Sequence, residues 1–226
     1  MKNLVLYALL LVLVLACNET TPPDQPDTPD PPVTRVDTVI KIVEVPVAPK
    51  SEPTPDVELS DSAKILIQAN RILEIFKNKT FEDLTNENLI SQKGVRFSPY
   101  ATIEPELDIL WKPDGFKRFT DKVLTWGVFD GSGDAILMKF PEFADRFIFD
   151  YDFRDSDSTL LNQVRQRGNL RNNIPKVYPE AQFVEFYVSG KNGAYAGFDW
   201  RVLRLVFEEE AGEWKLVGIV HSEWTS

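Results

Sequence analysis

The sequence has very little cysteine and histidine, the residues that bind soft metals and supply thiol or imidazole groups for catalysis. Of 226 residues, one is cysteine, Cys17, and one is histidine, His221. A single thiol excludes an intrachain disulfide and the multi-thiolate sites that structural zinc prefers. Carboxylates are plentiful, but the sequence contains no D-x-[DN]-x-[DN]-G calcium loop with its distal glutamate. We therefore expect no metal site and no cofactor.

Basic residues are also in the minority. The chain has 25 Lys and Arg against 35 Asp and Glu, which gives a formal net charge of −10. Binding to nucleic acid needs clustered cations that neutralise phosphates, so this balance argues against a nucleic-acid partner. Hydrophobic residues make up 43% of the chain, which is enough for a core. The length fits one globular domain with additional segments.

The N-terminus carries a hydrophobic run that is too short to span a membrane. Lys2 supplies a positive charge, and Leu4–Leu15 is almost wholly apolar. A membrane-spanning helix needs about 20 such residues, so this arrangement is typical of a signal peptide.

The run ends at Val14-Leu15-Ala16-Cys17, which resembles the lipobox of bacterial lipoproteins, although Leu15 is bulkier than the residue usual at that place. The resemblance implies cleavage behind Ala16 and acylation of Cys17, with palmitate-like chains that anchor the mature protein in a bilayer. The alternative is an ordinary secretory signal followed by an incidental cysteine.

The segment after Cys17 has the composition of an extended stalk. Asn18–Pro32 is rich in proline and acidic residues, and such a segment cannot bury enough apolar surface to fold. Val33–Val47 alternates apolar and polar residues, so it is either a strand that pairs with a sheet edge or a second chain, or further linker. We therefore predict a signal peptide over residues 1–16, a lipid-anchored stalk over 17–59 and a globular domain over 60–226.

The globular domain shows helical periodicity first and strand-like runs last. The patterns predict helices over Ser60–Phe76, Thr80–Leu89, Asp114–Leu124 and Pro141–Tyr151, and strands over Val95–Ser98, Ala101–Leu110, Gln182–Ser189, Asp199–Glu209 and Glu213–Trp224. A turn is expected at Asp130–Gly133. Helices followed by a C-terminal antiparallel sheet define an α+β domain.

This order resembles the NTF2-like fold, in which N-terminal helices lie across a strongly curved antiparallel sheet and form a cone with a pocket. Three stretches are similar to a group of uncharacterised secreted bacterial NTF2-like proteins: Lys93–Ile103, Thr125–Gly133 and Phe198–Thr225. The resemblance implies a fold and an extracytoplasmic setting, and it implies no catalytic residues.

The last two strands allow a prediction of which side chains share a face. A tight turn at Ala211-Gly212 places Glu208 opposite Lys215 and, further along, Arg201 opposite Ser222. The face with Arg201 and Ser222 is the more apolar, so we expect it to lie against the helices. His221 then lies on the outer face, where a structural role suits it better than catalysis. A slip of one residue would reverse this assignment.

The predicted pocket lies at the mouth of the cone and contains Arg201, Ser222, Trp224 and Trp126. Arg201 either binds a carboxylate ligand or forms an internal ion pair with an acid such as Asp199 or Asp121. A second set of aromatic residues could form a sugar-binding platform, although aromatic residues at strand spacing more often belong to the core. This set comprises Trp111, Trp126, Tyr178 and Trp200.

The sequence thus predicts an extracytoplasmic lipoprotein, held in the bacterial envelope through acylated Cys17, with the outer membrane and its surface as the expected site. Its domain is expected to bind a small molecule, a glycan or an envelope protein; the oligomeric state, including a dimer, is left open. No catalytic residue is identified. The alternative is a cone-pocket enzyme of the isomerase, dehydratase or hydrolase type. Such an enzyme requires a pocket with a buried carboxylate or with His221 beside a donor.

Overall fold

The computed structural model describes residues 58–116, 122–165, 167 and 171–225. The chain divides into two units, Met1–Thr54 and Pro55–Ser226, and all described residues belong to the second. The expected signal peptide, the acylation site Cys17 and nearly all of the stalk, including Val33–Val47, therefore lie outside the described residues. Within the described part of the chain, no helix has the length and apolar character needed to cross a membrane.

Helices and strands are interspersed along the chain. They are α1 (Asp61–Asn78), α2 (Asp83–Asn86), β1 (Val95–Ser98), β2 (Ile109–Trp111), α3 (Pro113–Phe116), β3 (Leu124–Val128), β4 (Ala135–Met138), α4 (Phe140–Phe147), η1 (Phe153–Asp155), β5 (Ser158–Leu161), α5 (Ile174–Val177), β6 (Gln182–Val188), η2 (Gly193–Tyr195), β7 (Arg201–Glu210) and β8 (Glu213–Glu223). The fold is thus α+β, as the sequence predicts.

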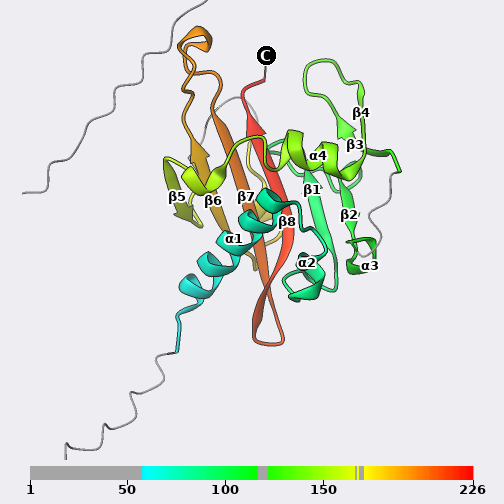
Figure 1. Ribbon diagram of the computed structural model, residues 1–226, viewed down its shortest axis with the longest axis vertical. Helices are drawn as coiled ribbons and strands as arrows, with labels where there is room; N and C mark the ends of the chain where they lie inside the picture. The colour runs from blue at the N-terminus through cyan, green and yellow to red at the C-terminus, as the bar shows by residue number, and fades with distance from the viewer. Residues whose placement is uncertain (1–57, 117–121, 166, 168–170, 226) are drawn as a thin grey trace, which may run out of the picture. The chain divides into compact units, whose positions relative to one another are not determined.

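A curved sheet of six strands forms the centre of the domain, in the order β2-β1-β8-β7-β6-β5 (Figure 1). Its neighbouring strands are antiparallel except for β1 and β8, which run parallel. The sheet is therefore mixed, and the prediction of a purely antiparallel sheet is wrong at this pair. Parallel strands need a long connection, and the whole chain between the first and last strands provides it. β3 and β4 form a separate antiparallel pair.

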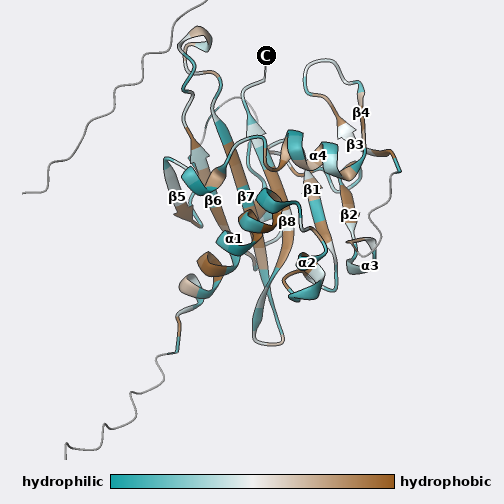
Figure 2. Cartoon of the chain, in the orientation of Figure 1, coloured by the Kyte–Doolittle hydropathy of each residue, from teal (hydrophilic) through white to brown (hydrophobic). Residues whose placement is uncertain are grey.

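Helix α1 covers one face of the sheet and confirms the first predicted helix. Ser60 caps its N-terminus by accepting a hydrogen bond from the backbone N–H of Ala63 at 3.3 Å. Lys79 ends it in the left-handed conformation. The buried side chains recur at helical spacing: Ile65, Ala69, Ile72, Leu73, Ile75 and Phe76. Figure 2 shows hydrophobic colouring along β7 and β8 where α1 crosses them.

Helix α4 packs on the same face and confirms the helix predicted near Pro141, although it ends at Phe147. Its buried rings join an aromatic cluster centred on Phe97 of β1. The rings within 5.6 to 6.2 Å of Phe97, centroid to centroid, are those of Trp111, Phe116, Trp126, Phe140 and Phe143. These side chains fill the inner side of the sheet with core.

The second predicted helix is confirmed only over α2. Asn88 adopts a left-handed conformation with φ 54°, which turns the chain away from the helix. The chain then runs along β8, where the N–H of Ser91 donates to the carbonyl of Leu216 and the N–H of Leu216 donates to the carbonyl of Leu89. Sheet hydrogen bonds thus replace the expected last helical turn.

Two further predictions between β1 and β3 are confirmed only in part. The strand predicted over Ala101–Leu110 is present only at Ile109 and Leu110, which belong to β2. Residues 101–108 form bends and turns instead, and the Arg96 guanidinium stabilises them by donating to the carbonyls of Pro105 and Asp108 at 2.9 and 3.1 Å. Of the helix predicted over Asp114–Leu124, residues Asp114–Phe116 are confirmed in α3. Residues 117–121 lie outside the described residues, and Leu124 already belongs to β3.

The three C-terminal strands are confirmed, and so is the hairpin turn between the last two. Ala211 and Gly212 both have positive φ, 53° and 82°, as a two-residue hairpin turn of the primed type requires. Glu208 lies opposite Lys215, as predicted. The turn at Asp130–Gly133 is also present, between β3 and β4.

A β-bulge further along this hairpin changes which side chains face the helices. Phe207 pairs with Leu216, but Val206 pairs with Gly218, so Val217 is an extra residue in β8. Beyond the bulge, Leu203 lies opposite His221 instead of Val220. The predicted register is therefore wrong in this half of the hairpin.

Candidate functional site

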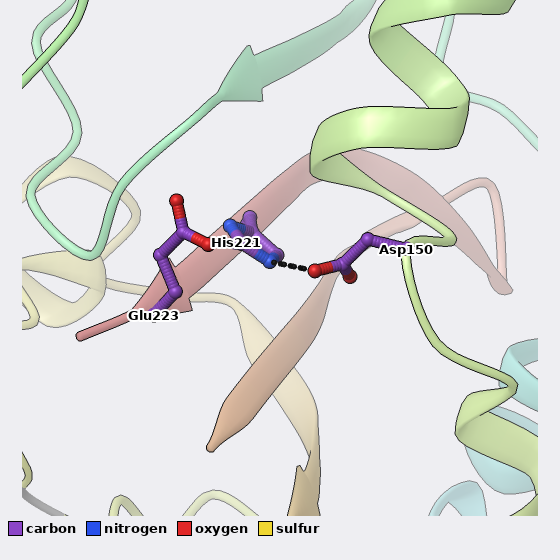
Figure 3. A group of neighbouring side chains, drawn as sticks. All are labelled: Asp150, His221 and Glu223. Carbon is purple, nitrogen blue, oxygen red and sulfur yellow. Dashed lines mark ion pairs between the residues drawn. The ribbon is translucent and has the colours of Figure 1, made fainter. Parts of the chain in front are cut away.

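A cluster of charged side chains lies where β7 and β8 meet the end of α4. Its members are Arg146, Asp150, Arg201, His221 and Glu223. Arg146 is in the last turn of α4, and Asp150 follows that helix. Arg201 begins β7, whereas His221 and Glu223 alternate on β8, and the bulge turns both of them toward the helices. Figure 3 shows Asp150 and Glu223 on either side of the His221 ring.

Two arginine–carboxylate pairs neutralise the cluster. The guanidinium of Arg146 donates to both carboxylate oxygens of Glu223, at 2.6 and 3.2 Å. Arg201 donates from Nε to Oδ2 of Asp150 at 2.6 Å, and its Nη2 lies 3.4 Å from Glu223. Burial acts to raise the pKa of Asp150, but a protonated His221 imidazole and the Arg201 guanidinium outweigh it and hold that pKa below its ordinary value. Asp150 is therefore ionised at neutral pH.

His221 is fully buried within this cluster, so its predicted place on the outer face is wrong. Its Nδ1 lies 3.2 Å from the carbonyl oxygen of Pro99, and its Nε2 lies 3.4 Å from Oδ2 of Asp150. The ring of Phe147 meets the imidazole edge-on, with 6.0 Å between centroids. A dissolved substrate cannot reach the imidazole in this arrangement.

A pocket of about 650 Å³ opens beside the cluster. Arg146, Asp199, Arg201 and Glu223 supply its charged lining. The aromatic lining comes from Tyr195, Phe198 and Trp224, which remain 60%, 54% and 43% exposed. The rings of Phe198 and Trp224 contact each other with centroids 5.1 Å apart. The pocket thus combines apolar ring faces with paired arginines and carboxylates at its base and with Asp199, whose carboxylate accepts backbone hydrogen bonds.

The loop that carries Tyr195 and Phe198 is held by Asp199. One oxygen of its carboxylate accepts hydrogen bonds from the backbone N–H groups of Lys191 and Asn192, at 3.0 and 2.9 Å. Gly190 allows this approach, because a Cβ there would lie 2.3 Å from the other oxygen of Asp199. The loop is therefore ordered by its own hydrogen bonds, with its aromatic side chains toward the pocket.

The structure brings together only part of the predicted pocket. Arg201 and Trp224 line it, but Ser222 lies on the opposite face of β8 because of the bulge. Trp126 is fully buried in the aromatic core, where its Nε1 donates to the carbonyl of Met138 at 2.9 Å. Arg201 does form an internal ion pair, but with Asp150 instead of Asp199. Asp121 lies outside the described residues.

The proposed sugar platform is not assembled either. Trp111 and Trp126 belong to the main core, Tyr178 packs against a cluster on the outer face of the sheet, and Trp200 is buried in a third cluster. Arg146, Asp150, Tyr195 and Phe198 belong to the site but are not among the residues predicted from the sequence. No motif marks the first three, while Phe198 begins one of the stretches that carry the NTF2-like resemblance.

A second, smaller cavity of about 240 Å³ lies near the end of β1 and is lined by Tyr100, Asp108 and Asp130, among others. Burial raises the pKa of Asp108 to about 6, against the lowering effect of hydrogen bonds from the Ser98 hydroxyl and the N–H of Glu104. This volume is below the roughly 300–1,000 Å³ of most small-molecule sites. The larger pocket is therefore the better candidate.

No family model matches the chain, and no curated protein matches it. Among solved structures, the chain is similar to a variant of Rd1NTF2_05, an NTF2-like designed protein. The two sequences are 12% identical, and the match covers 68% of this chain and 96% of the other, with a TM-score of 0.29. So weak a likeness carries no argument about the site.

Proposed function

We propose that this protein is a lipid-anchored lipoprotein of the bacterial envelope whose NTF2-like domain binds a neutral glycan or a similar polyhydroxylated molecule. The observation that carries this proposal is the pocket in which Tyr195, Phe198 and Trp224 surround the Arg146–Glu223 ion pair. Its volume of about 650 Å³ falls in the ordinary range for small-molecule sites.

Three exposed aromatic rings line the pocket. Exposed apolar side chains seldom cluster on the surface of a protein unless they bind something. Three large exposed aromatic side chains around one pocket therefore indicate a binding surface. A sugar offers apolar C–H faces that stack on such rings, and its hydroxyls need planar polar partners beside them. Arg201 and Glu223 supply donors and an acceptor at the base of the pocket.

The charge balance decides against an anionic ligand. Both guanidinium groups are already paired, Arg146 with Glu223 and Arg201 with Asp150. A ligand carboxylate would have to displace one of these buried acids from its arginine and leave it uncompensated, which is costly. A neutral ligand can hydrogen-bond to the outer edges of the pairs without breaking them.

The enzyme alternative has one observation in its favour and one against it. Asp108, with its pKa of about 6, lines the smaller cavity and has the properties of a general acid or base. However, His221 is fully buried and lines neither cavity, and core side chains fill the inner side of the sheet. Binding is therefore the function that the described residues support best.

The stalk fits the same function. Fully extended, residues 17–59 would let the domain reach on the order of 100 Å from the bilayer. This length would bring the pocket to envelope polysaccharides while acylated Cys17 stays in the membrane.

Replacement of the pocket rings tests the proposal. Soluble envelope glycan fragments are titrated into the purified protein by calorimetry, and we expect Phe198→Ala and Trp224→Ala each to weaken binding about tenfold, because each removes roughly 1.5 kcal/mol of ring contact. Leu137→Ala is the matched control, since Leu137 is 61% exposed on the separate β3–β4 pair. Equal affinities in all variants, or no binding of any glycan fragment to the parent protein, would refute the proposal.

A further inference from the structure

Three potential metal ligands converge at the end of β8. Asp150, His221 and Glu223 offer ligand atoms that all lie within 4.8 Å of one another (Figure 3). His221 and Glu223 are buried, and the side chain of Asp150 is only 11% exposed. The bulge in β8 is what places His221 and Glu223 on the same side as Asp150.

The hydrogen bond at Nδ1 sets the state of the imidazole. The carbonyl of Pro99 can only accept, so Nδ1 carries a hydrogen and donates it. In the neutral ring, Nε2 then presents a lone pair toward the carboxylate of Asp150. No described residue forms a hydrogen bond with Nε2 or with Oδ1 of Asp150, although both atoms are buried. Nε2 faces the other oxygen of Asp150, Oδ2, which accepts a hydrogen bond from Arg201. A cation held between the two side chains would satisfy both Nε2 and Oδ1.

A proton on Nε2 is the simpler solution, but it fits poorly. It would place three cations, including Arg146 and Arg201, beside two carboxylates in a buried cluster. The separation of 3.4 Å between Nε2 and Oδ2 is also long for a charge-assisted hydrogen bond, which usually measures about 2.7–2.9 Å. The same separation equals the distance between two ligands on a tetrahedral ion with bonds of about 2.1 Å.

We propose that Asp150, His221 and Glu223 form a binding site for a divalent transition cation of the zinc class. One imidazole nitrogen and two carboxylates suit zinc and its neighbours, whereas calcium and magnesium prefer oxygen ligands alone. The Nδ1–H bond to Pro99 is the outer-shell contact that typically orients a metal-binding histidine.

Arg146 and Arg201 compete with a metal ion for the two carboxylates of this site. A divalent cation with two carboxylates and a neutral imidazole is itself neutral, so it replaces the guanidinium charges instead of adding to them. Arg146 and Arg201 have room to leave, because their side chains are 40% and 27% exposed and line the larger pocket. Glu223 lines the same pocket, so a fourth position on the ion would open toward it. The proposed metal site shares Glu223 with the proposed glycan pocket, but zinc uptake is measured without any glycan, so either proposal can fail while the other holds.

The composition of the chain leaves few other residues that could bind zinc in such a test. His221 is the only histidine, and the Cys17→Ser change removes the only thiol. Tag-free Cys17→Ser protein is titrated with zinc against a chromophoric chelator. We expect one bound ion per chain, and a loss of affinity of about 100-fold in His221→Gln, as expected for removal of a ligand.

Two further variants keep the test independent of folding defects. Arg146→Ala should bind zinc more tightly than the parent, because it removes a competing cation; a merely structural cluster would not respond in this way. Asp145→Asn removes an exposed acid from the same helix, and the zinc affinity of this variant should equal that of the parent. The proposal is overturned if the parent protein takes up no zinc, if His221→Gln binds it equally well, or if Arg146→Ala fails to bind it more tightly.

Discussion

At the scale of single residues, the outer face of the sheet holds a second buried ion pair. Arg204 on β7 donates from Nε to Oε2 of Glu185 on β6 at 2.8 Å, and both side chains are almost completely buried. Burial lowers the pKa of Arg204, while Glu185 acts to raise it. The backbone N–H of Arg165 supplies a further hydrogen bond to Glu185 at 2.9 Å. Removing either partner would leave an uncompensated buried charge, which is strongly destabilising.

Asp108 gives a prediction about pH. Its pKa rises from 3.8 in the unfolded chain to about 6 in the folded one, so ionising it in the folded protein costs roughly 3 kcal/mol. Between pH 3.8 and about 6, Asp108 is ionised in the unfolded chain but still protonated in the folded one. The stability that protonated Asp108 contributes is therefore lost as the pH rises through about 6. Asp108→Asn avoids this loss and can still accept the hydrogen bonds from Ser98 and Glu104.

We therefore expect urea unfolding to show Asp108→Asn as more stable than the parent at neutral pH, with the difference shrinking toward pH 4. Glu106→Gln, an exposed acid in the same turn, should leave the stability nearly unchanged at both values. A difference that does not depend on pH would contradict the assigned cause.

At the scale of elements, the β7–β8 hairpin carries a small strain at its turn. Ala211 adopts φ 53°, a conformation that costs an L-residue with a Cβ roughly 1 kcal/mol. Asparagine tolerates this conformation and is favoured before glycine in this turn type. Ala211→Asn should thus raise the free energy of unfolding by up to about 1 kcal/mol, as measured by thermal and urea denaturation.

Gly212→Ala is the opposite change in the same turn. Gly212 has φ 82°, and a Cβ there would meet no atom within 4 Å. Any loss of stability would therefore come from the backbone conformation alone. If Gly212→Ala were neutral, or if Ala211→Asn were destabilising, the turn would not have the conformation described.

The elements that the sequence predicts well are those in which the spacing of apolar residues, or their composition, identifies a helix or a strand. Ile65 to Phe76 repeats every three or four residues, and β6 to β8 are rich in β-branched and aromatic residues. By contrast, α2 and β2 are short and depend on contacts with distant segments, such as the bonds between Leu89 and Leu216. Single-segment patterns contain no information about such contacts.

The bulge explains why the site was only half predicted. Leu216-Val217-Gly218-Ile219-Val220 is apolar or small at every position, so alternation cannot reveal which residue is extra. Gly218 was the available signal, because an isolated glycine inside a strand often marks a bulge. Arg146 and Asp150 reach the cluster from α4 and the bend behind it, and only the tertiary fold brings them there.

At the scale of the whole domain, both faces of the sheet are covered. The helices α1 and α4 lie on one face, and the outer face carries a second hydrophobic cluster that includes Ile103, Ile174 and Val206. Core side chains fill the inner side of the sheet, and the larger pocket lies beyond the ends of β7 and β8. This distribution places the larger pocket beside the first residue of β7 and the last of β8.

The proposed anchor makes a prediction for the intact chain. In cells labelled with radioactive palmitate, the parent protein should incorporate label and fractionate with membranes, because several acyl chains anchor far more firmly than one. Cys17→Ser should lose the label and leave the membrane fraction, whereas Thr20→Ala in the stalk should behave like the parent. Membrane association that persists in Cys17→Ser without any label in the parent would disprove acylation.

The burial of the only imidazole also makes the protein its own spectroscopic reporter. One histidine gives one pair of ring signals in a proton–carbon magnetic resonance spectrum, so these signals need no assignment. The ring current of Phe147, whose centroid lies 6.0 Å away, shifts them from the positions of an unfolded chain. Folding, protonation and occupation of the cluster by a cation can thus each be followed at a single residue that belongs to the site itself.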